Sequence, residues 1–413
     1  MNDSTINLMI TTASNGKDAS AFLRDKLRYF ENRENVKVKV KFVSWNRLLT
    51  NIIKSFKEGN SPDVFQLGTT WIETMAYLGY IAPLSYDIKK NPSLNYWMDE
   101  YCSYQGKKVA VPWLADTIIM SARSDILDEF NIKNEDLQDW DGFYQVCKKL
   151  VDERKRNNKI PFFLPFNVRP DMDTVHRFLA WVFAGDWNFP ELNPVPEKIF
   201  AVDNIMSYLN YLSKLIDIND LRLNDIDKHP YLINEDYYKN NSYVFYIGHW
   251  YGVIGQLVEE SNSANLYKVL PIPAKTSRFS TYGGGSVLSV SSRTDYPIKA
   301  QKLIEYIVSE NFADEWLNFT GGVPAFECKF WRRRDSSEQI NTLYELTRNS
   351  KTYPQHPLWT SIESVLQKEI SNCLWHIFEE KRSEIRILNQ LKKLDRDIIQ
   401  LLKLCWEMNC DEI

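Results

Sequence analysis

Eight polar and aromatic residues stand out in this sequence because their types suit one kind of ligand. Indole rings offer flat apolar faces for stacking, while carboxylate, amide and hydroxyl groups form hydrogen bonds with hydroxyl-rich molecules. A carbohydrate presents both apolar C–H faces and a rim of hydroxyls, so we interpret the set as a candidate carbohydrate site. The set comprises Asn15, Thr69, Thr70, Trp71, Asp116, Trp181, Trp250 and Trp331.

The alternative reading of each tryptophan is core packing, because tryptophan side chains are highly buried on average. The chain has 13 tryptophans, which is enough for both uses. Trp71 and Trp250 are the strongest candidates for a ligand contact, because both lie where a strand-like segment gives way to a loop. We keep both readings open for the other tryptophans.

The sequence contains no motif for a metal site or for covalent catalysis. The five histidines are isolated from one another and from cysteine pairs, and neither HExxH nor zinc-knuckle spacing occurs. The glycine run in YGGGS (282–286) matches neither a P-loop nor a dinucleotide-binding fingerprint. We therefore predict no metal and no cofactor. The many carboxylates leave a glycosidase pair as an open alternative.

Composition narrows the class of protein. The 413 residues exceed what one hydrophobic core usually fills, so we expect two lobes. A formal net charge of -4, with acids and bases interspersed, argues against nucleic acid as a partner. No segment is long and apolar enough to span a bilayer, and no signal peptide precedes the first strand-like segment. Either a leader was removed or the protein stays inside the cell. The six cysteines are scattered and leave the compartment undecided.

The elements that position the candidate residues begin with a repeating pattern. Strand-like segments at 6–12, 36–42 and 62–67 alternate with helical segments at 19–31 and 45–58. This order predicts a parallel sheet, in which ligands bind beyond the carboxyl ends of the strands. The loops with Asn15 and with Thr69, Thr70 and Trp71 both fall at such ends.

Three later segments complete the expected architecture. The segment 106–127 reads as a strand that breaks at Pro112 and resumes at Ile118, as expected where a chain passes between lobes. The glycines at 283–285 precede another strand and allow a close approach of backbone or ligand. A heptad-like apolar stripe predicts a terminal helix, with apolar positions Ile387, Leu391, Leu394, Ile398, Leu401 and Cys405. We expect this helix to dock on its own lobe in a monomer, and a dimeric coiled coil is the alternative.

The chain resembles the extracellular solute-binding proteins of carbohydrate ABC transporters, the group that includes maltose- and trehalose-binding proteins. The resemblance covers nearly the whole chain, and the combination of its separated segments is specific. Its main segments are ITTAS, VKVKVKFVSWNRLLTNIIKSFKEGNSPDVFQLGTTWIETMAYLGYIAPL, GKKVAVPWLADTIIMSARSDIL, LPIPAKTSRFSTYGGGSVLSVSS and AQKLIEYIVSENFADEWLNFTGGVPA.

The resemblance implies a two-lobed α/β fold of the periplasmic-binding-protein type, with the ligand cleft between discontinuous lobes. The expected N-terminal lobe comprises residues 1–117 and 281–324, and the expected C-terminal lobe comprises 118–280 and 325–413.

The resemblance also implies roles for individual residues. Thr69, Thr70 and Trp71 would face the cleft, Asp116 would accept sugar hydroxyls, and Trp250 would stack on a sugar ring. Gly284 and Gly285 would lie against the sugar. The basic segment FWRRRD at 330–335 departs from the family pattern.

The expected function is to bind an oligosaccharide and, by hinge closure, to deliver it to an ABC permease without chemical change. The expected partners are therefore the sugar and the permease subunits, and the expected location is extracytoplasmic if a leader was removed. Two alternatives remain at this point: a sugar-sensing domain of a signalling system that is not exported, and a carbohydrate-active enzyme.

Overall fold

A computed structural model of the chain describes residues 4–11, 18–85, 93–156, 168–219, 244–250, 267–275, 280–379 and 382–407. In these ranges the chain is a mixed α/β structure with one eight-stranded sheet and one two-stranded sheet. Of the described helices, none combines the length and apolar character needed to cross a membrane. The short elements include α3 (Ile72–Tyr77), α4 (Tyr96–Tyr101), β4 (Ser103–Tyr104), β5 (Lys107–Lys108), α5 (Ser124–Glu129), η2 (Asn134–Leu137), α14 (Lys329–Arg332) and η4 (Arg333–Ser336).

The N-terminal part of the chain is a parallel strand and helix repeat. It runs through β1 (Thr5–Thr11), α1 (Ala19–Glu34), β2 (Lys37–Val43), α2 (Trp45–Lys57) and β3 (Val64–Gly68). The first strand lies between the other two and is parallel to both. The predicted order of elements and the predicted parallel pairing are thus confirmed.

Local sequence explains these elements. The Asp18 carboxylate accepts a hydrogen bond from the Ser20 backbone N–H at 2.8 Å and so caps the first turn of α1. In β2 the lysines are exposed, while Val38 and Val40 are partly buried. This strand is the last in the described sheet order, and its charged face disfavours edge pairing with another chain.

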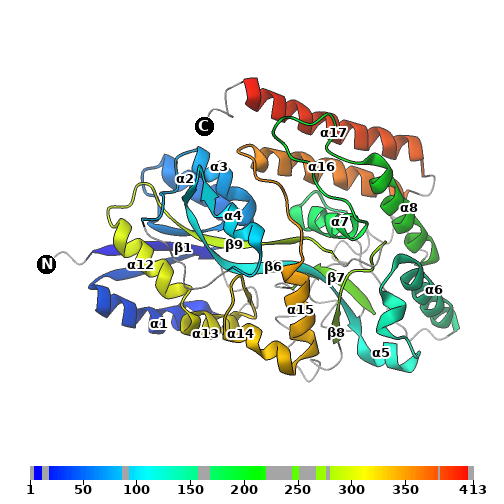
Figure 1. Cartoon of the computed structure of the whole chain (residues 1–413), viewed down its shortest axis with the longest axis horizontal. Helices are drawn as coiled ribbons and strands as arrows, with labels where there is room; N and C mark the ends of the chain where they lie inside the picture. The colour runs from blue at the N-terminus through cyan, green and yellow to red at the C-terminus, as the bar shows by residue number, and fades with distance from the viewer. Residues whose placement is uncertain are drawn as a thin grey trace.

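The long strand β6 (Ala110–Arg123) organises the middle of the molecule (Figure 1). Its first part pairs antiparallel with β9 (Gly283–Val290) and β10 (Val323–Pro324). Its last part pairs antiparallel with β7 (Phe245–His249) and β8 (Tyr267–Leu270). One strand therefore takes part in two sets of strand pairs. The main path of the sheet runs β10-β6-β9-β3-β1-β2, and β7 and β8 pair with β6 off this path.

The expected break at Pro112 is wrong. The chain continues as one strand from Ala110 to Arg123, with a register irregularity between Pro112 and Leu114. Proline is tolerated at such an irregularity because no regular ladder hydrogen bond from its nitrogen is required there.

Helices cover both faces of the N-terminal part of the sheet. On one face, α1 packs with α12 (Pro297–Ile307) and α13 (Glu310–Thr320) in a cluster that includes Ile6 and Leu8 of β1. On the other face, α2 and α3 form a smaller cluster with Met9. The alternation of β1 side chains between faces produces this division.

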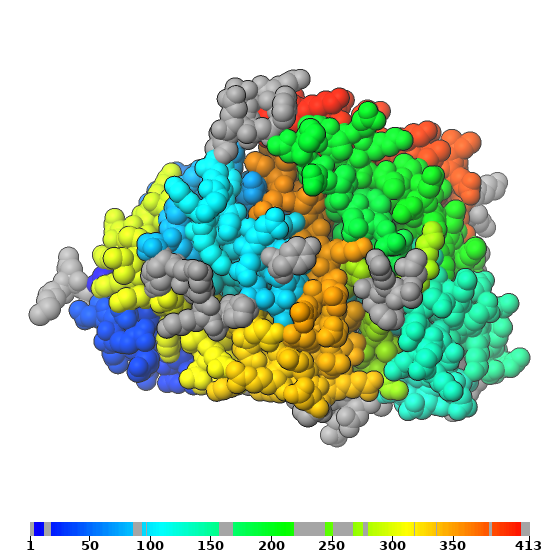
Figure 2. Space-filling model, in the orientation of Figure 1, coloured from blue at the N-terminus to red at the C-terminus, as the bar shows by residue number. Residues whose placement is uncertain are grey.

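The C-terminal part has its own large cluster, which extends from Ile118 to Leu402. Its helices are α6 (Trp140–Arg156), α7 (Met172–Ala184), α8 (Val202–Asn219), α16 (Trp359–Phe378) and α17 (Glu384–Glu407). By contrast, α15 (Glu338–Arg348) contributes Leu343 and Tyr344 to the cluster of the first strands. In the space-filling view the orange chain around α15 runs between the cyan and green parts of the surface (Figure 2).

The terminal helix α17 docks on its own chain. The stripe Ile387, Leu391, Leu394 and Ile398 is buried, and the helix packs on α16 and α8. Leu402 continues the stripe, whereas Leu401, which the heptad pattern had assigned to it, is partly exposed. A regular α-helix turns slightly less per residue than a strict heptad requires, so the buried face shifts along a straight helix.

The basic segment 330–335 has a structural account. Arg332 forms an ion pair with Glu310 at 3.0 Å, and Arg333 forms one with Asp314 at 3.3 Å. Both acids lie on α13, so the arginines of α14 and η4 face an acidic neighbour. Paired in this way, the segment does not form a free basic patch.

Candidate functional site

The residues of the GTTW segment form the turn that ends β3. Thr69, Thr70 and Trp71 make up η1 (Thr69–Trp71), and Thr69 is buried. The Thr70 hydroxyl donates a hydrogen bond to Glu363 Oε1 at 2.6 Å. The Trp71 indole N–H donates to Glu363 Oε2 at 3.4 Å. Because Glu363 lies on α16, these bonds join two parts of the chain that are far apart in sequence.

A second indole extends the aromatic surface at this turn. Trp45, the first residue of α2, stacks on Trp71 with ring centroids 4.9 Å apart and an interplanar angle of 27°. A side chain at Gly68 would place its Cβ 3.2 Å from the Trp71 ring. The Trp45 side chain remains 44% exposed, so part of this aromatic pair is open to solvent. Trp45 was not among the site residues that the sequence predicted.

The chain just before α16 and its first turns are held against the N-terminal part by further hydrogen bonds. The Thr74 hydroxyl donates to the Pro357 carbonyl at 2.8 Å. The Gln355 side-chain amide donates to the Tyr101 carbonyl at 3.1 Å, and the Tyr101 hydroxyl donates to the Tyr353 carbonyl. Residues 353–363 therefore lie directly against η1, α3 and the end of α4.

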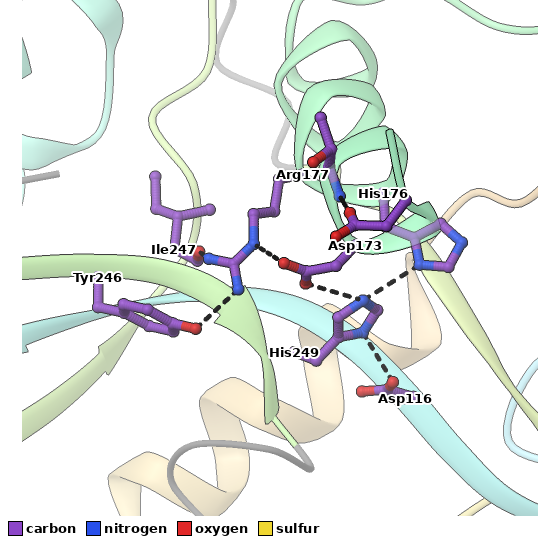
Figure 3. A network of polar contacts seen from close by, with 9 residues as sticks. Asp116, Asp173, His176, Arg177, Tyr246, Ile247 and His249 are labelled. Atoms are coloured by element: carbon purple, nitrogen blue, oxygen red, sulfur yellow. Dashed lines mark hydrogen bonds and ion pairs between the residues drawn. The ribbon is translucent and has the colours of Figure 1, made fainter. Parts of the chain in front are cut away.

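Asp116 lies on β6 and faces a histidine (Figure 3). Its Oδ2 atom is 2.7 Å from His249 Nδ1. Its Oδ1 atom is buried and has no hydrogen-bond partner among the residues that the structure describes. The carboxylate thus has one oxygen engaged and one available to a hydroxyl donor.

Behind His249 lies a network of charged groups from α7. His249 Nε2 is 3.1 Å from His176 Nδ1 and 3.7 Å from Asp173 Oδ1. Arg177 donates through Nε to Asp173 at 2.9 Å and through Nη2 to the Tyr246 hydroxyl at 2.7 Å. Figure 3 shows these side chains pointing toward one another from α7, β6 and β7.

The two histidines differ in their protonation chemistry. Burial opposes the charged form of His249, but the carboxylates of Asp116 and Asp173 outweigh burial and raise its pKa. Burial, together with the neighbouring His249, lowers the pKa of His176 well below its ordinary value. A protonated His249 can therefore donate from both ring nitrogens, to Asp116 and to a neutral His176.

The expectation that the histidines are isolated is wrong. His176 and His249 are 73 positions apart in sequence, and α7 and β7 bring them into contact. The presence of histidine directly before Trp250 was a local signal, but nothing local linked it to His176. Among the described residues, no group of three or more histidine, cysteine or acidic side chains is arranged to hold a metal ion.

A row of aromatic rings connects the two carboxylate positions. His176 stacks on Tyr282 at 4.1 Å between centroids, and Tyr353 lies 5.3 Å from Tyr282 and 4.7 Å from Trp359. Burial raises the pKa of Tyr282 well above its ordinary value, and the carboxylates of Glu363 and Asp116 add to this rise. Both carboxylates act on Tyr282, and Thr70 is hydrogen-bonded to Glu363. Thr70 and Asp116 therefore belong to one polar and aromatic region.

Trp250 and the glycine run lie beside this region. Trp250 follows directly after β7 and is 8% exposed, so most of its surface packs against protein. Gly284 and Gly285 on β9 pair with Asp116 and Ala115 of β6.

The backbone at Gly285 explains its glycine. It has a φ of 149°, and a Cβ there would lie 2.2 Å from the Leu114 carbonyl oxygen. Close contact between strands therefore accounts for this glycine without a ligand.

Two predicted site residues are corrected. Trp181 is 3% exposed and packs in the core with Tyr208 and Tyr211. Trp331 is fully buried, and its indole N–H donates to the Pro324 carbonyl at 3.2 Å. Neither side chain offers a face to a ligand, because both are used for packing. Asn15 lies outside the described residues.

Glu363, Tyr282, Tyr353 and Trp359 are members of the region that sequence reasoning missed. They come from α16 and from two loops. Tyr282 begins the YGGGS run, but no motif marks Tyr353, Trp359 or Glu363. Only the tertiary contacts bring them together.

Comparison with known proteins agrees with this architecture. One solved structure, an ABC transporter solute-binding protein from Thermotoga lettingae TMO with bound α-D-tagatose, has a TM-score of 0.78 and 14% identity over 97% of this chain and 100% of that chain. Another, T. maritima MalE3 with bound maltose, has a TM-score of 0.74 and 18% identity over 95% of this chain and 99% of that chain. These structures confirm the predicted α/β fold.

Sequence comparison gives the family. The diacetylchitobiose-binding protein DasA of Streptomyces coelicolor is 26% identical over 163 residues, which are 39% of this chain and 36% of that relative. The alignment thus spans about a third of the relative's length. The model of the bacterial extracellular solute-binding protein family matches residues 27–327. The chain therefore belongs to the bacterial extracellular solute-binding proteins, as the sequence resemblance predicted.

Proposed function

We propose that this protein binds an oligosaccharide in the region between η1, the first turns of α16 and the pair Asp116–His249. The observation that carries the proposal is the partly satisfied Asp116 carboxylate, and the partly exposed Trp45–Trp71 pair at η1 offers an aromatic face. A hydroxyl-rich ligand with apolar faces matches both features. The sugars named for the relatives, diacetylchitobiose, maltose and tagatose, support a carbohydrate ligand, and the first two, which are disaccharides, support an oligosaccharide.

Within this proposal, the protein has two lobes that close around the sugar and present it to an ABC permease outside the cytoplasm. The proposed division is 1–117 with 281–324, and 118–280 with 325–413. Hydrogen bonds from Thr70, Trp71 and Thr74 to residues 357–363 cross between these parts and are the contacts that closure would form. Sugar favours closure only as far as it binds the closed state better than the open one.

The same geometry favours binding over catalysis. Asp116 is paired with His249, and Glu363 accepts hydrogen bonds from Thr70 and Trp71. A glycosidase needs a carboxylic acid and a carboxylate on either side of the scissile bond. We propose that both carboxylates here serve as hydrogen-bond acceptors. Chromatography of sugars after incubation with the protein should recover them uncleaved, and cleavage products would contradict this part of the proposal.

A thermal-shift screen tests the proposed ligand class. The panel contains mono- and oligosaccharides, including diacetylchitobiose, maltose and tagatose. A true ligand at a hundredfold excess over its dissociation constant adds about 2.7 kcal/mol to the free energy of unfolding, which raises Tm measurably. A panel in which no sugar raises Tm would contradict the proposal.

Two variants then locate the site. Trp71→Ala should weaken binding of the sugar on the order of tenfold, which corresponds to about 1.4 kcal/mol. Trp331→Phe is the control, because Trp331 is buried away from the proposed region. It should lower stability and leave the dissociation constant unchanged. Equal losses of affinity in both variants would show that Trp71 acts only through the fold.

A further inference from the structure

His249 lies between two carboxylates and a second histidine. Its Nδ1 atom is 2.7 Å from Asp116 Oδ2, and its Nε2 atom is 3.1 Å from His176 Nδ1 and 3.7 Å from Asp173 Oδ1. The side chains of His249 and Asp116 are 20% and 28% exposed, so both are largely removed from water.

The charges around His249 do not balance without a proton on it. Asp116 faces it from β6, and Asp173, His176 and Arg177 face it from α7. The phenol groups of Tyr246, on its own strand, and Tyr282, just before β9, complete the titratable surroundings.

Arg177 already has partners of its own within this group. It is bound to Asp173, to the Tyr246 hydroxyl and to the Ile247 carbonyl. Arg177 thus pairs with Asp173, and protonated His249 supplies the positive charge beside Asp116.

We propose that His249 is a positioning residue that holds Asp116 ready for a carbohydrate hydroxyl, and that protonated His249 gives the higher affinity. This inference rests on the proposed function. The engaged Oδ2 atom fixes the carboxylate, and the unpartnered Oδ1 atom accepts the hydroxyl. A bound sugar removes water from Asp116, and removing water from an unpaired charge costs more than removing it from a charge in a close ion pair.

The direction of the pH effect follows from this arrangement. Because its carboxylate neighbours raise the pKa of His249, the proton stays on above the ordinary value of about 6.5. The favourable charge is fully present below that ordinary value and is lost as the pH rises through the raised one. Sugar affinity should therefore fall with rising pH across this window.

The charge of His249 can be tested separately from its effect on the orientation of Asp116. A neutral His249 can still donate from Nδ1 to Asp116 if its Nε2 accepts from His176 Nδ1–H, so the orientation of Asp116 survives while the charge does not. In His249→Asn the side-chain amide can donate one hydrogen bond to Asp116 and carries no charge. The sugar affinity of this variant should therefore stay constant over the pH range in which His249 loses its proton in the wild type.

The test is calorimetric titration of wild type and His249→Asn with the sugar that gives the largest thermal shift, across about pH 5 to pH 9. If binding raises the pKa of His249 by about one unit, wild-type affinity falls about tenfold across the window. His376→Asn is the control, because His376 also lies near a carboxylate, Glu379 at 3.1 Å, but at the far end of α16. It should keep the wild-type pH profile.

Each possible result either supports or overturns the inference. A flat wild-type profile, or a wild-type profile retained by His249→Asn, overturns the inference and leaves sugar binding in place. Failure of every sugar at every pH overturns the proposed function and this inference with it. If His249→Asn does not fold, the pKa of His249 measured by NMR in the wild type decides instead. It should rise when sugar binds, and an unchanged or lower value refutes the inference.

Discussion

Removing the Thr70 hydroxyl should weaken the contact between η1 and α16 by a predictable amount. In Thr70→Val the side-chain shape is kept, but Glu363 Oε1 loses a donor at 2.6 Å. Glu363 is only 7% exposed, so water replaces this bond poorly. A hydrogen bond to a charged group contributes about 1.5 to 3 kcal/mol, and we expect a loss of this size in the free energy of unfolding near neutral pH. Urea unfolding followed by fluorescence measures it.

The loss should depend on pH in a defined direction. Burial raises the pKa of Glu363, while the bonds from Thr70 and Trp71 act against that rise. Without the Thr70 hydroxyl the pKa rises further, so ionising Glu363 costs the folded state more. This cost is fully present above the raised pKa and disappears as the pH falls below the unfolded value of about 4.3, where the carboxyl is protonated in both states.

Thr74→Val is the matched control. The Thr74 hydroxyl also joins the N-terminal part to the chain before α16, but it donates to a neutral acceptor, the Pro357 carbonyl, at 2.8 Å. It should cost about 0.5 to 1.5 kcal/mol, with no dependence on the protonation of Glu363. A Thr70→Val loss below that of Thr74→Val, or one that is equal at acid and neutral pH, would refute the reasoning.

Two further predictions concern the framework around the site. Leu394→Ala, in the buried stripe of α17, should lower the free energy of unfolding by about 2 to 5 kcal/mol, whereas Leu404→Ala, at a 52% exposed position, should change it by less than about 0.5 kcal/mol. Chemical denaturation measures both, and equal effects would contradict the docking of α17. Gly285→Ala should destabilise more than Gly59→Ala. Both glycines have a positive φ, 149° and 74°, but only a Cβ at Gly285 meets a carbonyl, at 2.2 Å, whereas one at Gly59 meets nothing within 4 Å. Comparable melting temperatures for these two variants would be inconsistent with the described backbone at Gly285.

The sequence was informative where structure is local and periodic. The alternation in β2 and the helical spacing in α2 reflect one buried face each, so the parallel N-terminal repeat could be read directly. β6 was misread because twelve of its residues are buried and no alternation remains to show its continuity through Pro112.

The site was only half visible for a different reason. Thr70, Trp71 and Asp116 follow or lie on strands whose ends could be located from the pattern. Glu363 is 293 positions from Thr70, and no local pattern shows that α16 brings them together. Trp181 and Trp331 were wrongly predicted as ligand contacts because residue type alone does not distinguish a stacking surface from a core position. Only the packing of neighbouring helices decides between the two.

The continuity of β6 limits how the molecule can be divided. The first residues of β6 pair with β9, and its last residues pair with β7 and β8. Breaking one of these sets of strand pairs would therefore disturb the other. Any fragment that ends within Ala110–Arg123 would expose an unpaired sheet edge, so the two ends of the sheet cannot be produced as independent pieces by cutting there. Slow amide hydrogen exchange along β6 should accordingly be lost as one cooperative unit, which would make this strand a sensitive reporter of unfolding anywhere in the sheet.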